Sequence, residues 1–343
     1  MNIGILTGGG DCPGLNNTIR AVTRGAISRG WTVIGIRNGW AGVLKQDAYP
    51  LTVKDTDHLF DVGGTLLGSS RTNPTQTQED YAKAASIFSD MDLDGLVTIG
   101  GDDTLSVAGA LAGDGFPIVG VPKTIDNDVP ETDACIGFDT ATETISMSIS
   151  RLRTTSMSHH RVTVVETMGR QAGWLAAAGG IAGGSDFIAV PEITTALDDF
   201  VEHVQRRYDA GQPYSIIVVA EGATIGGLDL QSAAVQEEDE FGHVILSTRG
   251  VGENLAQTLE KETGYETRAT VLGHLQRGGS PTTFDRILGT RFGLAAVTFL
   301  EGKAHGQMTA LHGSAIEPVP LTRIAGKTRP LEPTYYELLR LFK

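Results

Sequence analysis

Short runs of apolar residues alternate along the chain with longer segments in which apolar residues recur at helical spacing. In the first part of the chain, the predicted buried strands are residues 2–6, 31–36, 96–99 and 116–121. Between the first two strands, Leu15, Ile19, Val22 and Ala26 fall on one face of a predicted helix. Strands that alternate with helices in this way indicate βαβ units around a mostly parallel sheet.

The same alternation starts again after Gly137. A helix is predicted near residues 140–152. The predicted strands that follow are residues 162–166, 187–190 and 215–220. We therefore expect two doubly wound, Rossmann-like α/β domains with a boundary near Gly137. The polar stretch at residues 236–242 is predicted to be a surface loop.

The composition narrows the possible functions. The 343 residues include 27 Lys and Arg against 41 Asp and Glu, which gives a net charge of −14. Such an acidic chain is a poor nucleic-acid binder, because Lys and Arg supply most of the affinity for phosphate backbones. An anionic ligand would need a local group of cations. The chain has two cysteines, no apolar run of membrane-spanning length, and Asp11 where a signal peptide needs apolar residues. We therefore expect a cytoplasmic protein that binds neither nucleic acid nor membrane.

Glycines and carboxylates follow two of the predicted strands, at the ends where ligands of such sheets bind. Residues 7–14 contain four glycines, which allow a phosphate to approach the backbone closely; a generic strand–helix turn is the alternative. Residues 100–104 place Asp102 and Asp103 after two glycines, which suits a Mg²⁺ ion shared with a phosphorylated ligand. Capping of the next helix is the alternative, and Asp102 is the better metal candidate of the pair.

The loop at residues 122–128 is the richest in reactive groups. It places Lys123, Thr124, Asp126 and Asp128 directly after a predicted buried strand. Phosphoryl transfer requires a carboxylate that accepts the proton of an attacking hydroxyl, beside a cation that binds the transferred group. We favour this interpretation over a polar turn.

Cations flank two further predicted strands. They are Arg161, Arg170, Arg268, His274 and Arg277. A guanidinium group matches the oxygens of a phosphate, so these residues indicate an anion site, with solvated side chains as the alternative. His159 and His160 are adjacent on what we predict to be an extended segment, where neighbouring side chains point to opposite sides. A metal site is therefore not expected there.

Taken together, these segments resemble the phosphofructokinase family. The matching strings, in chain order, are GGGDCPGLN, GGTLLGSSR, GGDDT, PKTIDND, RVTVVETMGRQAGW, FIAVPE and ETRATVLGHLQRGGSP. The resemblance runs from Ile3 to about Arg291 and implies the phosphofructokinase fold. Residues 1–137, with about 276–326, would then bind the phosphoryl donor. Residues 138–275, with the extreme C-terminus, would bind the sugar phosphate.

The resemblance implies a catalytic group around the third loop. Asp126 would accept the proton from the C1 hydroxyl of fructose 6-phosphate, and Thr124 and Asp128 would flank it. Asp102 would hold Mg²⁺. The contacts to the donor phosphate and to the transferred phosphoryl group would come from Gly10, Arg71 and Arg170.

The resemblance also implies a second set of residues for the sugar phosphate. The sugar itself would be contacted by Met168, Gly169, Arg170 and Glu221. Its 6-phosphate would be held by His274 and Arg277, with Arg161 and Arg268 supplied by a neighbouring subunit. We therefore expect a homodimer or a homotetramer.

Two positions bear on the identity of the donor. Family members that use pyrophosphate carry an acidic residue where this chain has Asp103 and Lys where it has Lys123. Bacterial members that use ATP typically carry Gly at the first position, and some also keep the Lys. A carboxylate at Asp103 would occupy the space of the ATP α-phosphate and repel it. The sequence therefore predicts reversible, Mg²⁺-dependent phosphorylation of fructose 6-phosphate by pyrophosphate, in glycolysis or gluconeogenesis. An ATP-dependent 6-phosphofructokinase and a non-catalytic sugar-phosphate sensor are the alternatives.

Overall fold

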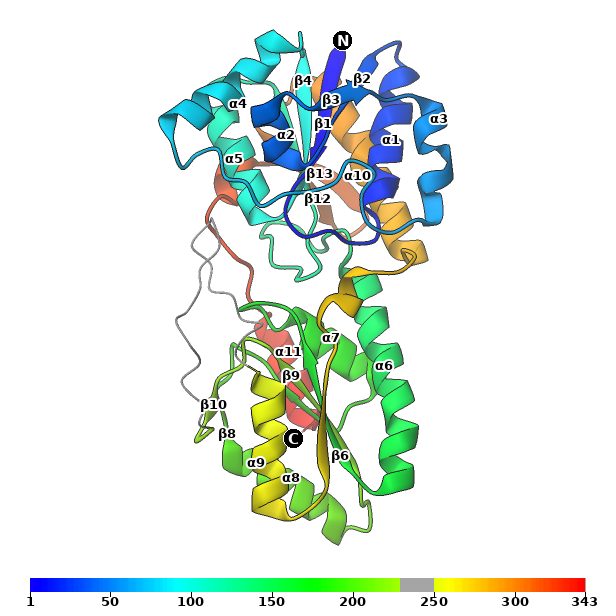
Figure 1. Cartoon of the computed structure of the whole chain (residues 1–343), viewed down its shortest axis with the longest axis vertical. Helices are drawn as coiled ribbons and strands as arrows, with labels where there is room; N and C mark the ends of the chain where they lie inside the picture. Colours follow the sequence, from blue (N-terminus) through cyan, green and yellow to red (C-terminus); the bar gives the residue numbers. More distant parts are fainter. Residues whose placement is uncertain (229–249, 343) are drawn as a thin grey trace. The chain divides into compact units, whose positions relative to one another are not determined.

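A seven-stranded sheet forms the centre of the first of two units in the computed structural model, which describes residues 1–228 and 250–342 (Figure 1). Unit 1 comprises Met1–Thr140 and Arg277–Thr328. The strand order is β13-β12-β5-β4-β1-β2-β3. The five central strands are parallel, and the two edge strands run antiparallel to their neighbours. The strands are β1 Asn2–Thr7, β2 Thr32–Ile36, β3 Ala48–Pro50, β4 Gly95–Gly100, β5 Ile118–Pro122, β12 Gln307–His312 and β13 Ala315–Pro320.

Helices lie on both sides of this sheet. In Figure 1, α1, α3 and α10 lie on one side and α2, α4 and α5 on the other. Their bounds are α1 Leu15–Ile27, α2 Gly39–Lys45, α3 Val53–Thr56, α4 Gln78–Asp90, α5 Asp102–Gly113 and α10 Thr283–Glu301. Short 3₁₀ helices are η1 Asp57–Asp61 and η4 Leu321–Arg323. The hydroxyls of Thr77 and Thr282 cap α4 and α10 by accepting the N–H of Asp80 and Asp285, as expected of N-cap residues.

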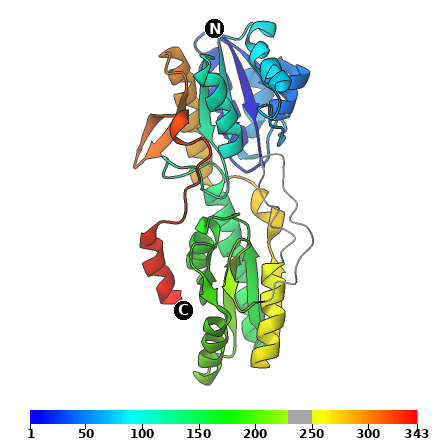
Figure 2. The same cartoon turned by 90° about the vertical axis from the view of Figure 1, so that its left-hand side faces the viewer.

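Unit 2 is built on a smaller sheet of four parallel strands in the order β11-β6-β9-β7. Its described residues are 141–228, 250–276 and 329–342. The strands are β6 Val162–Thr167, β7 Phe187–Ala189, β9 Ser215–Ala220 and β11 Thr267–Val271, with β8 Thr195–Ala196 and β10 Ile225–Gly226 as a separate parallel pair. The helices are α7 Trp174–Gly183, α8 Leu197–Asp209, α9 Val251–Thr263 and α11 Pro333–Leu339, with the 3₁₀ helix η5 Arg340–Phe342. Helix α6 Phe138–His159 begins in unit 1, and the 3₁₀ helix η3 Gly273–Arg277 ends there. The C-terminal segment with α11 is drawn in red in Figure 2.

The predicted fold class is confirmed, because both central sheets are wound by helices in the doubly wound α/β manner. Strands β1, β4 and β5 are buried along almost their whole length, which explains why they appear in the sequence as continuous apolar runs. The edge strands β3 and β13 were not predicted, since each has exposed and half-buried positions and contains proline. Residues 236–242 lie outside the described residues.

The prediction of an extended segment at His159 and His160 was wrong. Helix α6 continues to His159, because residues 153–159 contain neither Gly nor Pro to end it. His160 has a φ of 57°, and this left-handed residue ends the helix before β6. Within residues 1–228 and 250–342, no three His, Cys, Asp or Glu side chains gather as a metal-binding group. In the same part of the chain, no helix is both long and apolar enough to span a membrane.

Candidate functional site

The carboxyl ends of three neighbouring strands in unit 1 carry the loops that the sequence singled out. The sheet order places β5, β4 and β1 side by side. Backbone hydrogen bonds continue beyond the strand ends, since Gly8 N–H donates to Ile99 O at 2.9 Å and Lys123 N–H donates to Gly100 O at 2.9 Å. Three loops that are far apart in the sequence therefore form one surface at this edge of the sheet.

Lys123 is the cation among these loops. It is 2% exposed, and its Nζ donates to Gly8 O at 2.8 Å and also to Gly10 O. Burial lowers the pKa of Lys123 to about 8, and the Arg277 guanidinium acts in the same direction, while the Asp126 carboxylate opposes it. An ammonium group is thus held at the glycine loop that the sequence predicts to bind phosphate.

Asp126 lies in the tight turn that follows Lys123. Its N–H donates to Thr124 Oγ1 at 3.1 Å, and the residue is 5% exposed. Its Oδ1 is buried and accepts no hydrogen bond from the described residues. Asn127 adopts a φ of 53° and accepts Cys135 N–H at 2.9 Å, which fixes the turn. A buried carboxylate oxygen without a donor suits a general base.

Asp102 and Asp103 form the first turn of α5. The N-cap residue is Gly101, so neither carboxylate occupies the N-cap position itself. Oδ1 of Asp102 accepts hydrogen bonds from Ser106 Oγ at 3.2 Å and Gly326 N–H at 3.1 Å, which orient the carboxylate. Mg²⁺ commonly takes one or two protein carboxylates and completes its shell with substrate phosphates and water. The residues present fit such an ion.

Arg277 lies against the glycine loop. Its Nη1 donates to Asp11 O at 3.2 Å. A Cβ built on Gly10 would lie 2.2 Å from that nitrogen, so a larger residue at Gly10 would displace the guanidinium from this position. The sequence grouped Arg277 with His274 at the sugar 6-phosphate. The structure brings it to Gly10 in unit 1, whereas His274 belongs to unit 2.

The segment before Arg71 is bound to the same glycine loop. Gly9 N–H donates to Ser70 O at 2.9 Å, and the Ser69 hydroxyl donates to Gly9 O. Sequence reasoning missed these two serines, although both stand in the string GGTLLGSSR that was matched. The exposed side chain of Arg71 therefore extends from a backbone segment that is hydrogen-bonded to the glycine loop.

In unit 2, the predicted sugar contacts lie at the carboxyl ends of β6 and β9, which are neighbours. Arg170 N–H donates to Glu221 Oε1 at 3.0 Å. Arg170 has a φ of 51°, and Gly169 before it has a φ of 133°, so the backbone turns sharply here. Met168, Gly169, Arg170 and Glu221 are thus brought together.

Gln276 is a residue that sequence reasoning missed. It is fully buried, and its Oε1 accepts Met168 N–H at 3.3 Å, while its Nε2 donates to Gly273 O at 3.0 Å. It therefore ties the 3₁₀ turn η3, which carries the exposed His274, to the loop after β6. Nothing in the string GHLQRGG indicates that its glutamine links this turn to the loop after β6.

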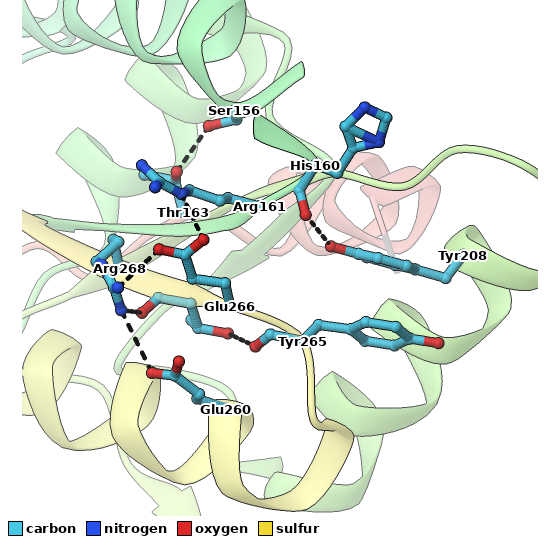
Figure 3. Close-up of polar contacts among 10 residues, drawn as sticks. Ser156, His160, Arg161, Thr163, Tyr208, Glu260, Tyr265, Glu266 and Arg268 are labelled. Atoms are coloured by element: carbon cyan, nitrogen blue, oxygen red, sulfur yellow. Dashed lines mark hydrogen bonds and ion pairs between the residues drawn. The ribbon is translucent and has the colours of Figure 1, made fainter. Parts of the chain in front are cut away.

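Arg161 and Arg268 form an ion-pair network at the other end of the sheet. Figure 3 shows Glu266 between them: its Oε2 lies 2.8 Å from Arg161 Nε, and its Oε1 lies 2.7 Å from Arg268 Nη2. Glu260 Oε2 lies 3.4 Å from Arg268 Nη1. The hydrogen bond from Arg161 and the two positive charges lower the pKa of Glu266.

The two basic groups of unit 2 are separated by the length of a strand. Arg161 immediately precedes β6 and Met168 immediately follows it. Six residues of strand span about 20 Å. Within one chain, Arg161 therefore does not reach a phosphate bound beside the loop that carries Arg170.

Known families and proteins resemble this chain over most of its length. Residues 2–300 match the model of the family described as phosphofructokinase. The chain is 47% identical over 342 residues to pyrophosphate–fructose 6-phosphate 1-phosphotransferase of Dictyoglomus thermophilum, with 100% of this chain and 98% of that protein covered. It is 43% identical over 324 residues to ATP-dependent 6-phosphofructokinase 3 of Streptomyces coelicolor, with 94% of each covered.

A solved structure has the same fold. The pyrophosphate-dependent phosphofructokinase of Marinobacter aquaeolei matches with a TM-score of 0.83 and 25% identity, over 97% of this chain and 86% of that one. The family match covers most of the chain, and it includes the glycine loop, the loop of Lys123 and Asp126, and the strands that carry the arginines. The chain belongs to the phosphofructokinase family.

Proposed function

We propose that the chain transfers a phosphoryl group reversibly between pyrophosphate and the C1 hydroxyl of fructose 6-phosphate, with Mg²⁺ as the metal. The observation that carries the proposal is the position of Lys123, whose buried ammonium group donates hydrogen bonds to the carbonyl oxygens of Gly8 and Gly10. The two pyrophosphate-dependent relatives described above support the same donor, while the ATP-dependent relative of Streptomyces coelicolor keeps ATP as the second candidate.

Asp126 would act as the general base. Its buried Oδ1 accepts no hydrogen bond within the described part of the chain, so it can accept the proton of the attacking C1 hydroxyl. Thr124 and Asp128 would flank the reacting groups, and the hydrogen bond from Asp126 N–H to Thr124 Oγ1 supports a fixed geometry for this turn.

Asp103 and Lys123 would select the donor. Asp103 stands in the first turn of α5, where a carboxylate would repel the α-phosphate of ATP. Pyrophosphate has no third phosphate to place there. Lys123 would bind a phosphate that lacks the contacts of a nucleotide, and Gly10 and Arg71 would contact the donor from the neighbouring loops. Orthophosphate is then the leaving group, and this favours reversibility.

Mg²⁺ would be held by Asp102 and by oxygens of the donor. The hydrogen bonds from Ser106 and Gly326 to Asp102 Oδ1 support an oriented carboxylate. A bound Mg²⁺ would neutralise part of the negative charge of the donor. Arg170 and Arg71 would add positive charge around the transferred group.

The sugar phosphate would bind to unit 2. Met168, Gly169, Arg170 and Glu221 would contact the sugar, and His274 would contact its 6-phosphate. Arg161 and Arg268 would serve the 6-phosphate of a second copy of the chain, because they lie at the far end of β6 from Arg170 in their own copy. A homo-oligomer is therefore part of the proposal. Arg277 would bind the same 6-phosphate. Because its guanidinium contacts Gly10, the phosphoryl donor is the second candidate ligand of this side chain.

The test is an assay of fructose 1,6-bisphosphate formation with Mg²⁺ and either pyrophosphate or ATP at matched concentration. Turnover with pyrophosphate alone supports the proposal. Turnover with ATP alone keeps the acceptor and refutes the assigned role of Asp103. A protein that binds fructose 6-phosphate and turns over neither donor would be the non-catalytic sensor.

A further inference from the structure

The loop after β6, residues 168–173, is held in place through its backbone. We refer to it as the Arg170 loop. Gln276 and Glu221 accept the N–H groups of Met168 and Arg170, as described above. Arg170 itself is in the left-handed region, with a φ of 51°. A non-glycine residue keeps that conformation only when its surroundings hold it, so the contacts at the far end of the loop matter as well.

Glu192 joins the far end of the Arg170 loop to the C-terminal segment, residues 329–342. Its Oε1 accepts Gly173 N–H at 2.9 Å and Leu331 N–H at 2.7 Å. A Cβ built on Gly173 would lie 2.6 Å from Glu192 Oε2, so only glycine allows the carboxylate to approach this closely. Leu331 is 1% exposed and Leu339 is 2% exposed, so the C-terminal segment is anchored by two buried leucines.

Trp174 makes a second junction with the same segment. It is the first residue of α7 and directly follows the Arg170 loop. Its indole Nε1 donates to Arg329 O at 3.1 Å, and the Arg329 guanidinium lies 4.3 Å from the centre of its ring. The ring of Tyr335 meets it edge-on at 5.2 Å between centroids. Arg329 is fixed in turn by Glu332, with Nη2 and Oε1 2.6 Å apart.

We propose that the C-terminal segment is a positioning element for the Arg170 loop, and that it sets the affinity for the anionic sugar phosphate. It acts through Glu192 and Trp174, and it touches no substrate itself. Bidentate binding of two phosphoryl or sugar oxygens by Arg170 requires a fixed backbone at that residue. The segment lies beyond residue 300, where the match to the family model ends, so the match assigns it no role. The inference rests on the proposed function, because it assumes that Arg170 contacts the sugar.

The kinetic test uses Arg329→Ala, which removes the cation over Trp174 and the ion pair with Glu332 while leaving the main-chain acceptor. Trp174→Phe is the second variant, because it removes the indole N–H donor but leaves an aromatic ring at this position. Arg340→Ala, an exposed arginine on the same segment, is the matched control. A buried cation–π contact corresponds to a factor of roughly ten in an equilibrium constant. We expect KM for fructose 6-phosphate to rise by about that factor and by more than KM for pyrophosphate, with Arg340→Ala like the wild type.

Hydrogen exchange on the protein without substrate gives a readout that does not depend on activity. Amides of residues 168–174 should exchange faster in Arg329→Ala and Trp174→Phe than in the wild type and in Arg340→Ala. Circular dichroism establishes that each variant is folded; if Arg329→Ala is not, Trp174→Phe carries the comparison.

The outcomes separate the two proposals. A wild type without turnover of fructose 6-phosphate refutes the proposed function, and the exchange result alone then decides whether the segment holds the loop. An active wild type whose variants keep both KM values overturns the inference, even if exchange becomes faster. Equal rises in both KM values overturn it too, because they would indicate a general loss of structure.

Discussion

The Nζ atom of Lys123 donates a 2.8 Å hydrogen bond to the carbonyl oxygen of Gly8, a residue 115 positions earlier in the chain. This bond places a cation at the turn of the glycine loop, where a phosphate would bind, and buries it there. The charge of this group depends on pH near neutrality, because burial lowers the pKa of Lys123 to about 8.

Activity with pyrophosphate should fall as pH rises through about 8, since burial lowers the pKa of Lys123 to that value and the neutral amine binds phosphate poorly. The profile of kcat/KM for pyrophosphate reports the free enzyme and is the quantity to measure. In Lys123→Arg this decline should move to higher pH, because arginine stays protonated. A wild-type profile that stays flat from pH 7 to 9.5 would contradict the role of Lys123.

Asp103→Gly should lower discrimination against ATP. Removing the carboxylate removes the charge and the bulk that would oppose an α-phosphate, so ATP turnover should rise by about tenfold or more, the factor given by roughly 1.4 kcal/mol of relieved repulsion. The measurement is kcat/KM for each donor in the variant and the wild type. Asp80→Gly, in the first turn of α4, is the matched control. No gain with ATP would refute the explanation of donor choice.

Arg277→Ala distinguishes the two phosphates that this residue could bind. Its guanidinium lies against Gly10, so a role at the donor loop predicts a rise in KM for pyrophosphate. A role at the sugar 6-phosphate predicts a rise in KM for fructose 6-phosphate, as expected for His274→Ala. Loss of a charge-assisted contact corresponds to roughly a tenfold to hundredfold change. The structure favours the first outcome, and identical KM patterns for the two variants would favour the second.

A mixture of two inactive variants should regain activity if the site is shared between copies of the chain. Asp126→Asn lacks the base, and Arg161→Ala lacks the arginine that lies at the far end of β6. A mixed dimer of the two has one intact site, so refolding them together should restore up to about a quarter of wild-type activity. Each variant refolded alone is the control. Activity that stays at the level of the separate variants would show that Arg161 serves no site in a neighbouring copy.

Asp285→Ala should destabilise unit 1 by about 3 kcal/mol, because three donors would lose their acceptor in a buried place. Asp285 is fully buried and accepts the N–H of Gly137 at 2.9 Å, the N–H of Thr140 at 2.9 Å and the hydroxyl of Thr140 at 2.6 Å. Thermal unfolding, with the exposed Asp198→Ala as control, measures the loss.

The size of this loss should depend on pH. Burial raises the pKa of Asp285 to about 6 from 3.8, so the folded state binds more protons than the unfolded state between these values. The contribution of Asp285 to stability therefore falls as pH rises from about 4 to 6. The difference between Asp285→Ala and the wild type should be larger at pH 5 than at pH 7.5, and the opposite order would contradict the raised pKa.

The sequence by itself determined the fold class and the loops that carry the chemistry. Buried parallel strands such as β4 and β9 are almost entirely apolar, so they appear as short apolar runs, and the polar residues that follow them stand out. That is why the loops of Asp102 and Asp126 could be found without a structure. The family strings added the expectation that Arg170 and Glu221 contact the sugar.

Only the tertiary structure decided how distant groups meet. It placed Arg277 on Gly10, put Gln276 behind Met168, and joined Glu192 to the C-terminal segment. None of these contacts has a periodicity, because each depends on which side chains happen to face one another after the strands are ordered in the sheet. The end of α6 was also decided there, since the left-handed φ of His160 depends on how the chain enters β6. Local sequence thus sets which residues are buried or exposed on an element, whereas the partners of a polar side chain are fixed by packing between elements.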